Sequence, residues 1–330
     1  MNLFSLPQFR PLPFLSNPHV QTVIANVVHW SSDRIRPASH VAPLPDGDAI
    51  VLHETTPPEW RPGDCCVALV HGLGGCHNSP YMRRLTNHLA EAKLRVYRID
   101  MRGAGAGASL AKRIYNADCS ADIREAVAWI HRRNPESPIM VAGFSLGGNI
   151  VLKMAGEAGE HPLPGLAGVA TVAAPIDLSA CSRLIADYPF YDRFYVRRLK
   201  AQVRLHLRHN PDQPDPGLSR IQTLYQFDDL YTAPRGGFAS VLDYYDRASS
   251  SLWVPRLRIP TFMLTAKDDP FIAWEPYAEL PIMPNLEVHV APRGGHLGFL
   301  GLDGNGGIRW AEAQVLKWIL KRAIPDIGVM

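Results

Sequence analysis

The segment VAGFSLGGN, residues 141–149, places a serine where its hydroxyl could act as a nucleophile. Ser145 lies between Gly143 and Gly147 in a Gly-x-Ser-x-Gly pattern, after an apolar run and before a helix-like segment. In a strand–turn–helix of this kind the glycines let the strand and the helix approach closely, and the helix N-terminus favours negative charge near the serine. The five-residue pattern alone is weak, because a turn serine among glycines looks the same. The apolar run before the pattern and the helix-like segment after it favour Ser145 as a nucleophile.

A serine hydroxyl needs a histidine base and a carboxylate that orients this base. In this arrangement the acid and then the histidine are expected later in the chain, each in a loop after a strand. Asp268 and Asp269 follow the apolar run TFMLTA, and His296 lies in a glycine-rich loop after the run LEVHV. The order predicts His296 as the base and one of the two aspartates as the acid. The other aspartate would have a capping or turn role.

Backbone N–H groups must also stabilise the charge that develops on the attacked carbonyl oxygen. One donor should be the amide of Leu146, which follows the serine. The other should be the amide of Leu73, in the loop LVHGLGG that follows an earlier apolar run. His71, before this loop, is expected to hold it by hydrogen bonds rather than to act in catalysis.

Six short apolar runs are typical of strands that are buried on both faces of a parallel sheet. These runs are CVALV (66–70), RVYRI (95–99), IMVAG (139–143), GVATVAA (168–174), TFMLTA (261–266) and LEVHV (286–290). Helical patterns occur at 79–93, 119–133 and 307–323, with apolar residues at three- and four-residue spacing. The alternation predicts an α/β fold with a mostly parallel, doubly wound sheet.

Two further features frame this sheet. Residues 39–54 predict an N-terminal hairpin around the Asp46–Gly47 turn. Between 178 and 255 the alternation stops, and the residues read as helices with no convincing strand between them. We expect an N-terminal arm (1–38), a core in two parts (39–177 and 256–330) and a helical cap or lid insertion (178–255).

Composition excludes several classes of protein. The 330 residues include 34 basic and 31 acidic ones, and no run of Lys and Arg interleaved with aromatic residues predicts nucleic-acid binding. The five cysteines are an odd number without disulfide or zinc spacing, so a reducing cytoplasm fits best. No metal or organic cofactor is implied, and the expected partner is a small-molecule substrate.

The N-terminal 22 residues do not resemble a signal peptide, because prolines and polar residues interrupt the apolar ones. No apolar stretch approaches the roughly 20 residues that span a bilayer, so no transmembrane segment is expected. Pro7, Pro11 and Pro13 disfavour an amphipathic helix. Several apolar residues near this end could pack on the protein's own core, which we favour, or make weak contact with a membrane surface. They are Phe4, Leu6, Phe9, Leu12, Phe14 and Leu15.

A set of motifs along nearly the whole chain carries a family resemblance. The motifs are NPHVQT (17–22), HGLGG (71–75), NSPY (78–81), Arg102-Gly103, GFSLGGN (143–149), FDDLYTAPRGGF (227–238), DYYDRAS (243–249), AKDDPF (266–271) and GGHLGF (294–299). With them the chain resembles the YheT-like branch of the α/β-hydrolase superfamily, bacterial candidate esterases related to the animal abhydrolase-domain lipases. The resemblance implies an α/β-hydrolase fold and a triad of Ser145, Asp269 and His296.

The choice of Asp269 over Asp268 has further support. Consecutive side chains leaving a strand point in different directions, so both carboxylates cannot reach one imidazole. The loop AKDDPFI also matches the usual superfamily pattern with Asp269 as the acid and Ile272 as the branched residue that follows. Asp268 would then cap amide groups of the loop.

The expected activity is hydrolysis of acyl esters through an acyl-enzyme, with an apolar acyl chain in the substrate. A thioesterase or amidase would use the same triad, and a catalytically silent binding scaffold is a different class that stays open. The aromatic and apolar residues of the cap should supply much of the acyl pocket; they are Phe190, Tyr191, Phe194, Tyr195 and Leu199. His19 and Gln21 could line the pocket mouth or clamp the N-terminal arm. The FDD and DYY segments, 227–229 and 243–245, are expected to pack the insertion onto the core.

Overall fold

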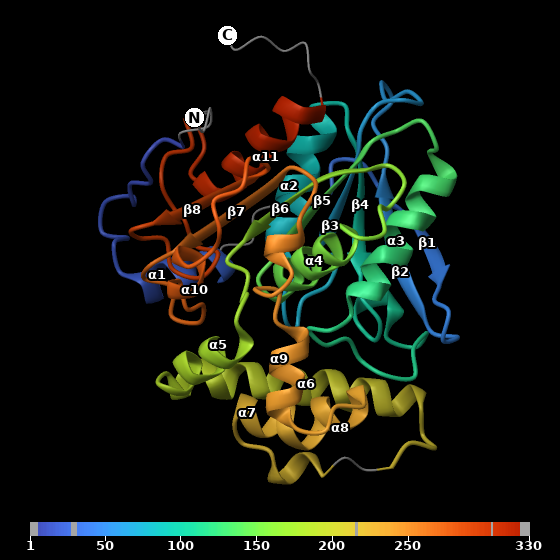
Figure 1. The fold of residues 1–330 in the computed structure, drawn as a ribbon, viewed down its shortest axis with the longest axis vertical. Helices are drawn as coiled ribbons and strands as arrows, with labels where there is room; N and C mark the ends of the chain where they lie inside the picture. Colours follow the sequence, from blue (N-terminus) through green and yellow to red (C-terminus); the bar gives the residue numbers. More distant parts are fainter. Residues whose placement is uncertain (1–5, 28–31, 215–216, 305, 324–330) are drawn as a thin grey trace.

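A single twisted sheet forms the centre of the molecule (Figure 1). The computed structural model describes residues 6–27, 32–214, 217–304 and 306–323, and within these ranges eight strands pair in the order β1-β2-β4-β3-β5-β6-β7-β8. The strands are β1 (Ala38–Pro43), β2 (Ala49–Thr55), β3 (Cys66–Val70), β4 (Arg95–Asp100), β5 (Ile139–Phe144), β6 (Leu166–Val172), β7 (Thr261–Ala266) and β8 (Leu286–Ala291). The hairpin strands β1 and β2 are antiparallel, β2 is antiparallel to β4, and the other pairs are parallel. The predicted fold class is confirmed.

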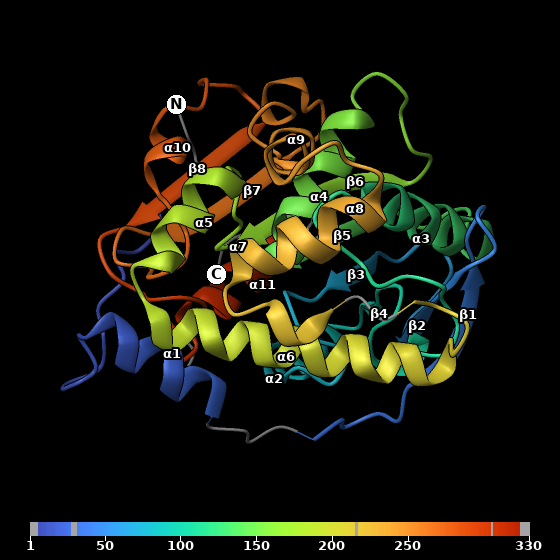
Figure 2. The same cartoon turned by 90° about the horizontal axis from the view of Figure 1, so that it is seen from below.

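The central strands are buried because helices cover both faces of the sheet. Every residue of β3, β5 and β7 is buried, as their continuous apolar runs predict. The covering helices are α2 (Pro80–Glu91), α3 (Ser120–Arg133), α4 (Leu146–Glu157) and α11 (Trp310–Ala323). Helix α2 packs beside α11 on one face, and α3 packs beside α4 on the other (Figure 2). This doubly wound arrangement brings the loops after the parallel strands to one edge of the sheet.

The segment between β6 and β7 forms a helical layer below the sheet in Figure 1, and we call residues 178–255 the cap. Its helices are α5 (Leu178–Ala186), α6 (Pro189–His209), η2 (Leu218–Arg220), α7 (Leu224–Phe227), the π-helix η3 (Asp228–Thr232), α8 (Ala233–Gly236) and α9 (Val241–Ala248). The short helix η4 (Val254–Arg256) follows at the end of the cap and packs against α4. Val196, Leu199 and Val203 of α6 belong to a small apolar cluster that also includes Phe227 and Tyr231. Ile114 of the core also belongs to this cluster, so it joins the cap to the loops beneath it.

The sequence patterns did not predict the N-terminal helix α1 (Pro18–Val27). Pro18 suits the first helical position, and the Asn17 side chain caps the helix by accepting hydrogen bonds from the amides of His19 and Val20. Before this helix, Phe9 is buried against Phe299 and Trp310, with ring centroids 5.4 Å apart in both pairs.

The other apolar residues of the arm do not all behave like Phe9. Phe14 is 99% exposed, so only part of the arm packs on the core, and Phe4 lies outside the described residues. In the part of the chain that the structure describes, we find no helix whose length and hydropathy would allow it to cross a membrane.

Candidate active site

Ser145 occupies a strained turn between β5 and α4. Its backbone has φ 51° and ψ −125°, a region that non-glycine residues rarely adopt, and it lies directly before the first turn of α4. The strand and the helix are so close that a Cβ on Gly143 would lie 2.5 Å from the carbonyl oxygen of Gly147, and a Cβ on Gly147 would collide with the carbonyl of His71. The two glycines of the motif are thus required by packing, and the strain projects the serine from the end of the strand.

The structure brings Ser145, Asp269 and His296 together in one hydrogen-bonded chain. Ser145 Oγ lies 2.9 Å from His296 Nε2, and His296 Nδ1 lies 2.9 Å from Asp269 Oδ2. Asp269 and His296 are 4% and 3% exposed, so water cannot compete freely for this pair. With Nδ1–H donating to the carboxylate, Nε2 presents a lone pair to the serine hydroxyl.

The two adjacent aspartates have different partners. The other oxygen of Asp269, Oδ1, accepts hydrogen bonds from the amides of Phe271 and Ile272, at 2.8 and 3.1 Å. Asp268 turns away from the imidazole and accepts a hydrogen bond from the amide of Gly295 at 2.9 Å. Burial raises the pKa of Asp268, and the neighbouring charge of Asp269 adds to the shift. Asp268 therefore supports the loop that carries His296.

The amides expected to form the oxyanion site lie beside the serine. Leu73 and Leu146 line the same pocket as Ser145 and His296. Within the described ranges, neither backbone N–H donates a hydrogen bond to another protein group. Two residues at one pocket that both have amides without protein acceptors are compatible with the binding of a developing oxyanion.

His71 holds the loop around Leu73, as predicted. It is fully buried; Nδ1 lies 2.8 Å from the carbonyl oxygen of Gly72, and Nε2 accepts a hydrogen bond from the Met101 amide at 3.3 Å. The Gly72 amide also donates to the hydroxyl of Tyr81, at 2.9 Å. Burial lowers the pKa of His71, which favours the neutral ring that can donate from one nitrogen and accept at the other.

Helix α1 holds the loop of His296 through Thr22 and Gln21, of which only Gln21 was considered for a clamp from the sequence. The amide of His296 donates to Thr22 Oγ1 at 2.9 Å. Gln21 is 1% exposed; its Oε1 accepts from the Leu300 amide at 2.6 Å, and its Nε2 donates to the Leu300 carbonyl oxygen at 3.2 Å. The Asn17-Pro18 pair is a helix-start pattern that could have revealed α1.

The clamp extends to the cap through His19. Its Nδ1 lies 3.0 Å from the hydroxyl of Tyr191 on α6, and the two rings stack. Neither His19 nor Gln21 is among the described residues that line the two cavities beside Ser145. Of the two roles considered for His19 and Gln21, the contacts favour the clamp, whereas Thr22 of the same motif lines the outer groove.

Two cavities meet at Ser145 and His296. The inner pocket, about 110 Å³, lies between the β5–α4 turn and the cap, and its walls include Tyr195 and Leu199. The outer groove, about 720 Å³, runs past α1 and α6, and its walls include Phe190, Tyr191, Phe194 and Tyr195. The aromatic residues predicted for an acyl pocket are thus divided between two cavities.

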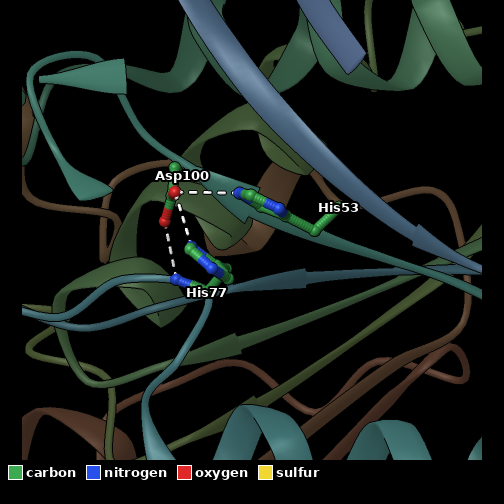
Figure 3. Close-up of side chains that lie close together, drawn as sticks. All are labelled: His53, His77 and Asp100. Carbon is green, nitrogen blue, oxygen red and sulfur yellow. Dashed lines mark hydrogen bonds and ion pairs between the residues drawn. The ribbon is translucent and has the colours of Figure 1, made fainter. Parts of the chain in front are cut away.

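A second cluster combines His53 of β2, His77 of the loop after β3 and Asp100 at the end of β4, side-chain types that ligate zinc (Figure 3). His53 Nε2 and His77 Nδ1 lie 3.0 and 2.7 Å from Asp100 Oδ2, and the imidazole rings stack with centroids 3.5 Å apart. Imidazoles on a tetrahedral metal diverge, with ring centres about 5 Å apart, so the stacked rings suit a hydrogen-bonded cluster better.

The backbone contacts of Asp100 explain what this cluster does. It also accepts hydrogen bonds from the amides of His77 and Ala106, at 2.6 and 2.8 Å. Burial alone would raise the pKa of Asp100, but hydrogen bonds from His53 and His77 outweigh it and hold the pKa well below the ordinary value. An ionised Asp100 thereby ties the end of the Leu73 loop to the sheet.

The comparisons with known proteins agree with this architecture. Residues 67–301 match the family model described as the α/β hydrolase fold. The YheT protein of Escherichia coli (strain K12), named as a candidate esterase, is 29% identical over 322 residues, which cover 96% of this chain and 94% of that protein. A monoacylglycerol lipase of Saccharomyces cerevisiae is 30% identical over 263 residues, which cover 76% of this chain and 58% of the yeast enzyme.

Among solved structures, the Pyrococcus furiosus esterase Pf2001 superimposes with a TM-score of 0.58 at 14% identity, over 88% of this chain and 94% of that one. At this identity the match shows the fold alone. The resemblance to YheT that the sequence motifs suggested is confirmed. Since the family model spans most of the chain and the relatives include enzymes named as esterases and lipases, this protein belongs to the α/β-hydrolase fold family and is a hydrolase of that family.

Proposed function

We propose that this protein hydrolyses acyl esters through a covalent acyl-enzyme on Ser145. The observation that carries the proposal is the hydrogen-bonded chain from Ser145 Oγ through His296 to Asp269, at 2.9 Å for each step and at the junction of two cavities. A half-buried serine nucleophile with a buried histidine base and a buried orienting acid meets the requirements for acyl transfer. The lipase and phospholipase names of relatives agree with an ester substrate.

In the first step His296 Nε2 takes the proton from Ser145 as Oγ attacks the carbonyl carbon. The amides of Leu73 and Leu146 donate hydrogen bonds to the oxygen that becomes negative. The bond between the carbonyl carbon and the alcohol oxygen then breaks, and His296 gives its proton to the departing alcohol. Asp269 keeps the imidazole in the required tautomer and stabilises its positive charge.

In the second step a water molecule replaces the alcohol. His296 takes a proton from this water as its oxygen attacks the acyl carbon, and the same two amides stabilise the oxyanion. The bond to Ser145 Oγ breaks, Oγ regains the proton from His296, and the carboxylic acid leaves.

The two cavities divide the substrate between acyl and alcohol parts. The inner pocket is somewhat smaller than the cavity of about 150 Å³ that accommodates benzene, so it suits a short acyl chain of up to about six carbons. The outer groove is several times larger and opens past the exposed rings of Phe190 and Phe194, so it suits the alcohol part. We therefore assign the acyl chain to the inner pocket and the alcohol to the groove.

Labelling with a fluorophosphonate probe tests the nucleophile. The purified protein should be modified on Ser145, and Ser145→Ala should lose labelling and about 10⁴ to 10⁶ in turnover. Ser251→Ala is the matched control and should keep both, because this half-buried serine makes no side-chain hydrogen bond within the described residues. Matched ester, thioester and amide substrates then test the bond that is cleaved. An unlabelled Ser145 in a folded protein would refute the mechanism, and faster turnover of the thioester or amide would refute the ester assignment.

A further inference from the structure

A polar cluster lies on the cap side of the inner pocket. Asp228, in the FDD segment and the π-helix η3, accepts hydrogen bonds from Thr232 Oγ1 at 2.8 Å and from the Tyr245 hydroxyl at 2.9 Å. The Tyr245 hydroxyl also lies 3.0 Å from Ser182 Oγ. All four residues line the pocket that contains Ser145 and His296. We call Ser182, Asp228, Thr232 and Tyr245 the polar cluster.

The carboxyl group of Asp228 has no cationic partner. Among the described residues that line the pocket, none is Lys or Arg. Burial raises the pKa of Asp228 to about 7, although the hydrogen bonds from Thr232 and Tyr245 oppose this shift. A carboxyl group that is shielded from water and has no counter-charge destabilises a protein, so its presence at this half-buried position calls for a compensating role.

The hydrogen bonds inside the cluster do not use the full capacity of Asp228. A carboxylate offers about four acceptor positions, and two are occupied by Thr232 and Tyr245. Asp228 is half-buried and lines the cavity. The π-helix widens one helical turn at this position, a distortion that is common at functional sites. Packing of the cap onto the core, the role expected for FDD, does not require an ionisable group at this wall.

The polar cluster lies on the side of the inner pocket opposite Ser145, where the acyl chain of a bound ester would extend. The core side of the pocket carries Ser145, Leu146 and His296, and the cap side carries the polar cluster. Most of the remaining wall is apolar, including Leu73, Leu178 and Ile185. An acyl chain whose carbonyl carbon lies at Ser145 therefore extends across apolar wall toward hydrogen-bonding groups.

We propose that the polar cluster binds a hydroxyl group on the acyl chain, so that the preferred substrates are short hydroxyacyl esters. The substrate hydroxyl would donate to the open acceptor positions of Asp228. This inference rests on the proposed ester hydrolysis and adds the substrate class. If the cluster only tied α5, η3 and α9 together, a hydroxyl on the acyl chain would bring no advantage.

Competition between esters tests the inference. Ethyl hexanoate is compared with its analogues that carry one hydroxyl at each position from C3 to C6, by titration of the released acid. We expect one hydroxylated ester to exceed ethyl hexanoate by about tenfold or more in kcat/KM, the range of one hydrogen bond to a carboxyl group. Equal kcat/KM for all esters would overturn the proposal. A stronger preference for an amino analogue at the same position would also overturn it, in favour of ionic recognition.

Variants of Asp228 test whether the polar cluster causes the preference for a hydroxylated ester. Asp228→Leu should bring the ratio of hydroxylated to plain ester close to one, and Asp228→Asn, which keeps size and one acceptor, should lower the ratio at least threefold. Asp229→Asn is the matched control, because this neighbour is exposed and outside the pocket, and it should keep the wild-type ratio. An unchanged ratio in a folded Asp228→Asn refutes the site even when Asp228→Leu fails to fold. If no ester is hydrolysed and Ser145 is not labelled, the proposed function itself fails.

Discussion

Replacement of Asp269 by asparagine should separate orientation of the imidazole from stability of the loop. Asp269 Oδ1 accepts two backbone hydrogen bonds, from Phe271 and Ile272, whereas Oδ2 faces His296 Nδ1. In Asp269→Asn the amide oxygen should stay with the two backbone donors, because the opposite orientation would lose both hydrogen bonds. The NH2 group would then face Nδ1, which must become an acceptor, and the proton would move to Nε2. In that tautomer His296 cannot accept the proton of Ser145.

The expected loss is about 10⁴ in turnover, or about 5.5 kcal/mol in transition-state stabilisation, with little change in thermal stability. Asp268→Asn is the matched control, because its amide oxygen can still accept from Gly295, and turnover should stay within about tenfold. The assay is steady-state hydrolysis of nitrophenyl butanoate by both variants, with melting temperatures measured in parallel. A larger loss in Asp268→Asn than in Asp269→Asn would refute the assignment of the acid.

Four further outcomes follow from particular contacts. Thr22→Val removes the hydroxyl that accepts a hydrogen bond from the His296 amide, so kcat should fall about tenfold with KM little changed. An unchanged kcat would show that the contact of α1 with this loop does not affect catalysis. Gly147→Ala places a Cβ against the His71 carbonyl, so chemical denaturation should show a loss of about 1–3 kcal/mol, and wild-type stability would contradict the close approach of strand and helix. Burial raises the pKa of Asp228 to about 7 in the folded protein, so between about pH 4 and 7 this carboxyl group is ionised in the unfolded chain and still protonated in the folded one. The stability of the wild-type protein therefore falls as pH rises through this range. The melting temperature of Asp228→Asn, measured relative to wild type, should rise across the same range and then level off. Ile185→Trp should reduce turnover of hexanoate esters more than of acetate esters, whereas Phe190→Ala should act on esters with large alcohols; parallel effects of both variants on all esters would refute the division of the cavities.

The parallel part of the sheet was predictable because burial on both faces leaves a pattern within each strand. The runs at 66–70 and 261–266 coincide with β3 and β7, and the helices between the strands follow the spacing of their apolar residues. The helical nature of residues 178–255 could also be read from local spacing, as could the hairpin around Asp46–Gly47.

Helix α1 was not anticipated, for a physical reason. Its main contacts are with a loop almost 300 residues away, through Gln21 and Leu300, and a hydrogen bond of this kind leaves no periodic trace in either segment. The same holds for the stacked pair His53 and His77, which come from β2 and from the loop after β3 and meet at Asp100, the last residue of β4.

By itself, the sequence determined the order of strand, serine, acid and histidine, because each of these residues follows a strand whose apolar pattern is local. It also contained the glycines that allow the turn at Ser145. Tertiary structure alone decided that Thr22 meets the amide of His296 and that Asp228 lies at the wall of the inner pocket. The loop pattern already favoured Asp269 over Asp268 as the acid, and the structure adds the contact of its carboxylate with the imidazole. Periodicity records which face of an element is buried, whereas the meeting of side chains from distant elements depends on how the sheet, the cap and α1 pack together.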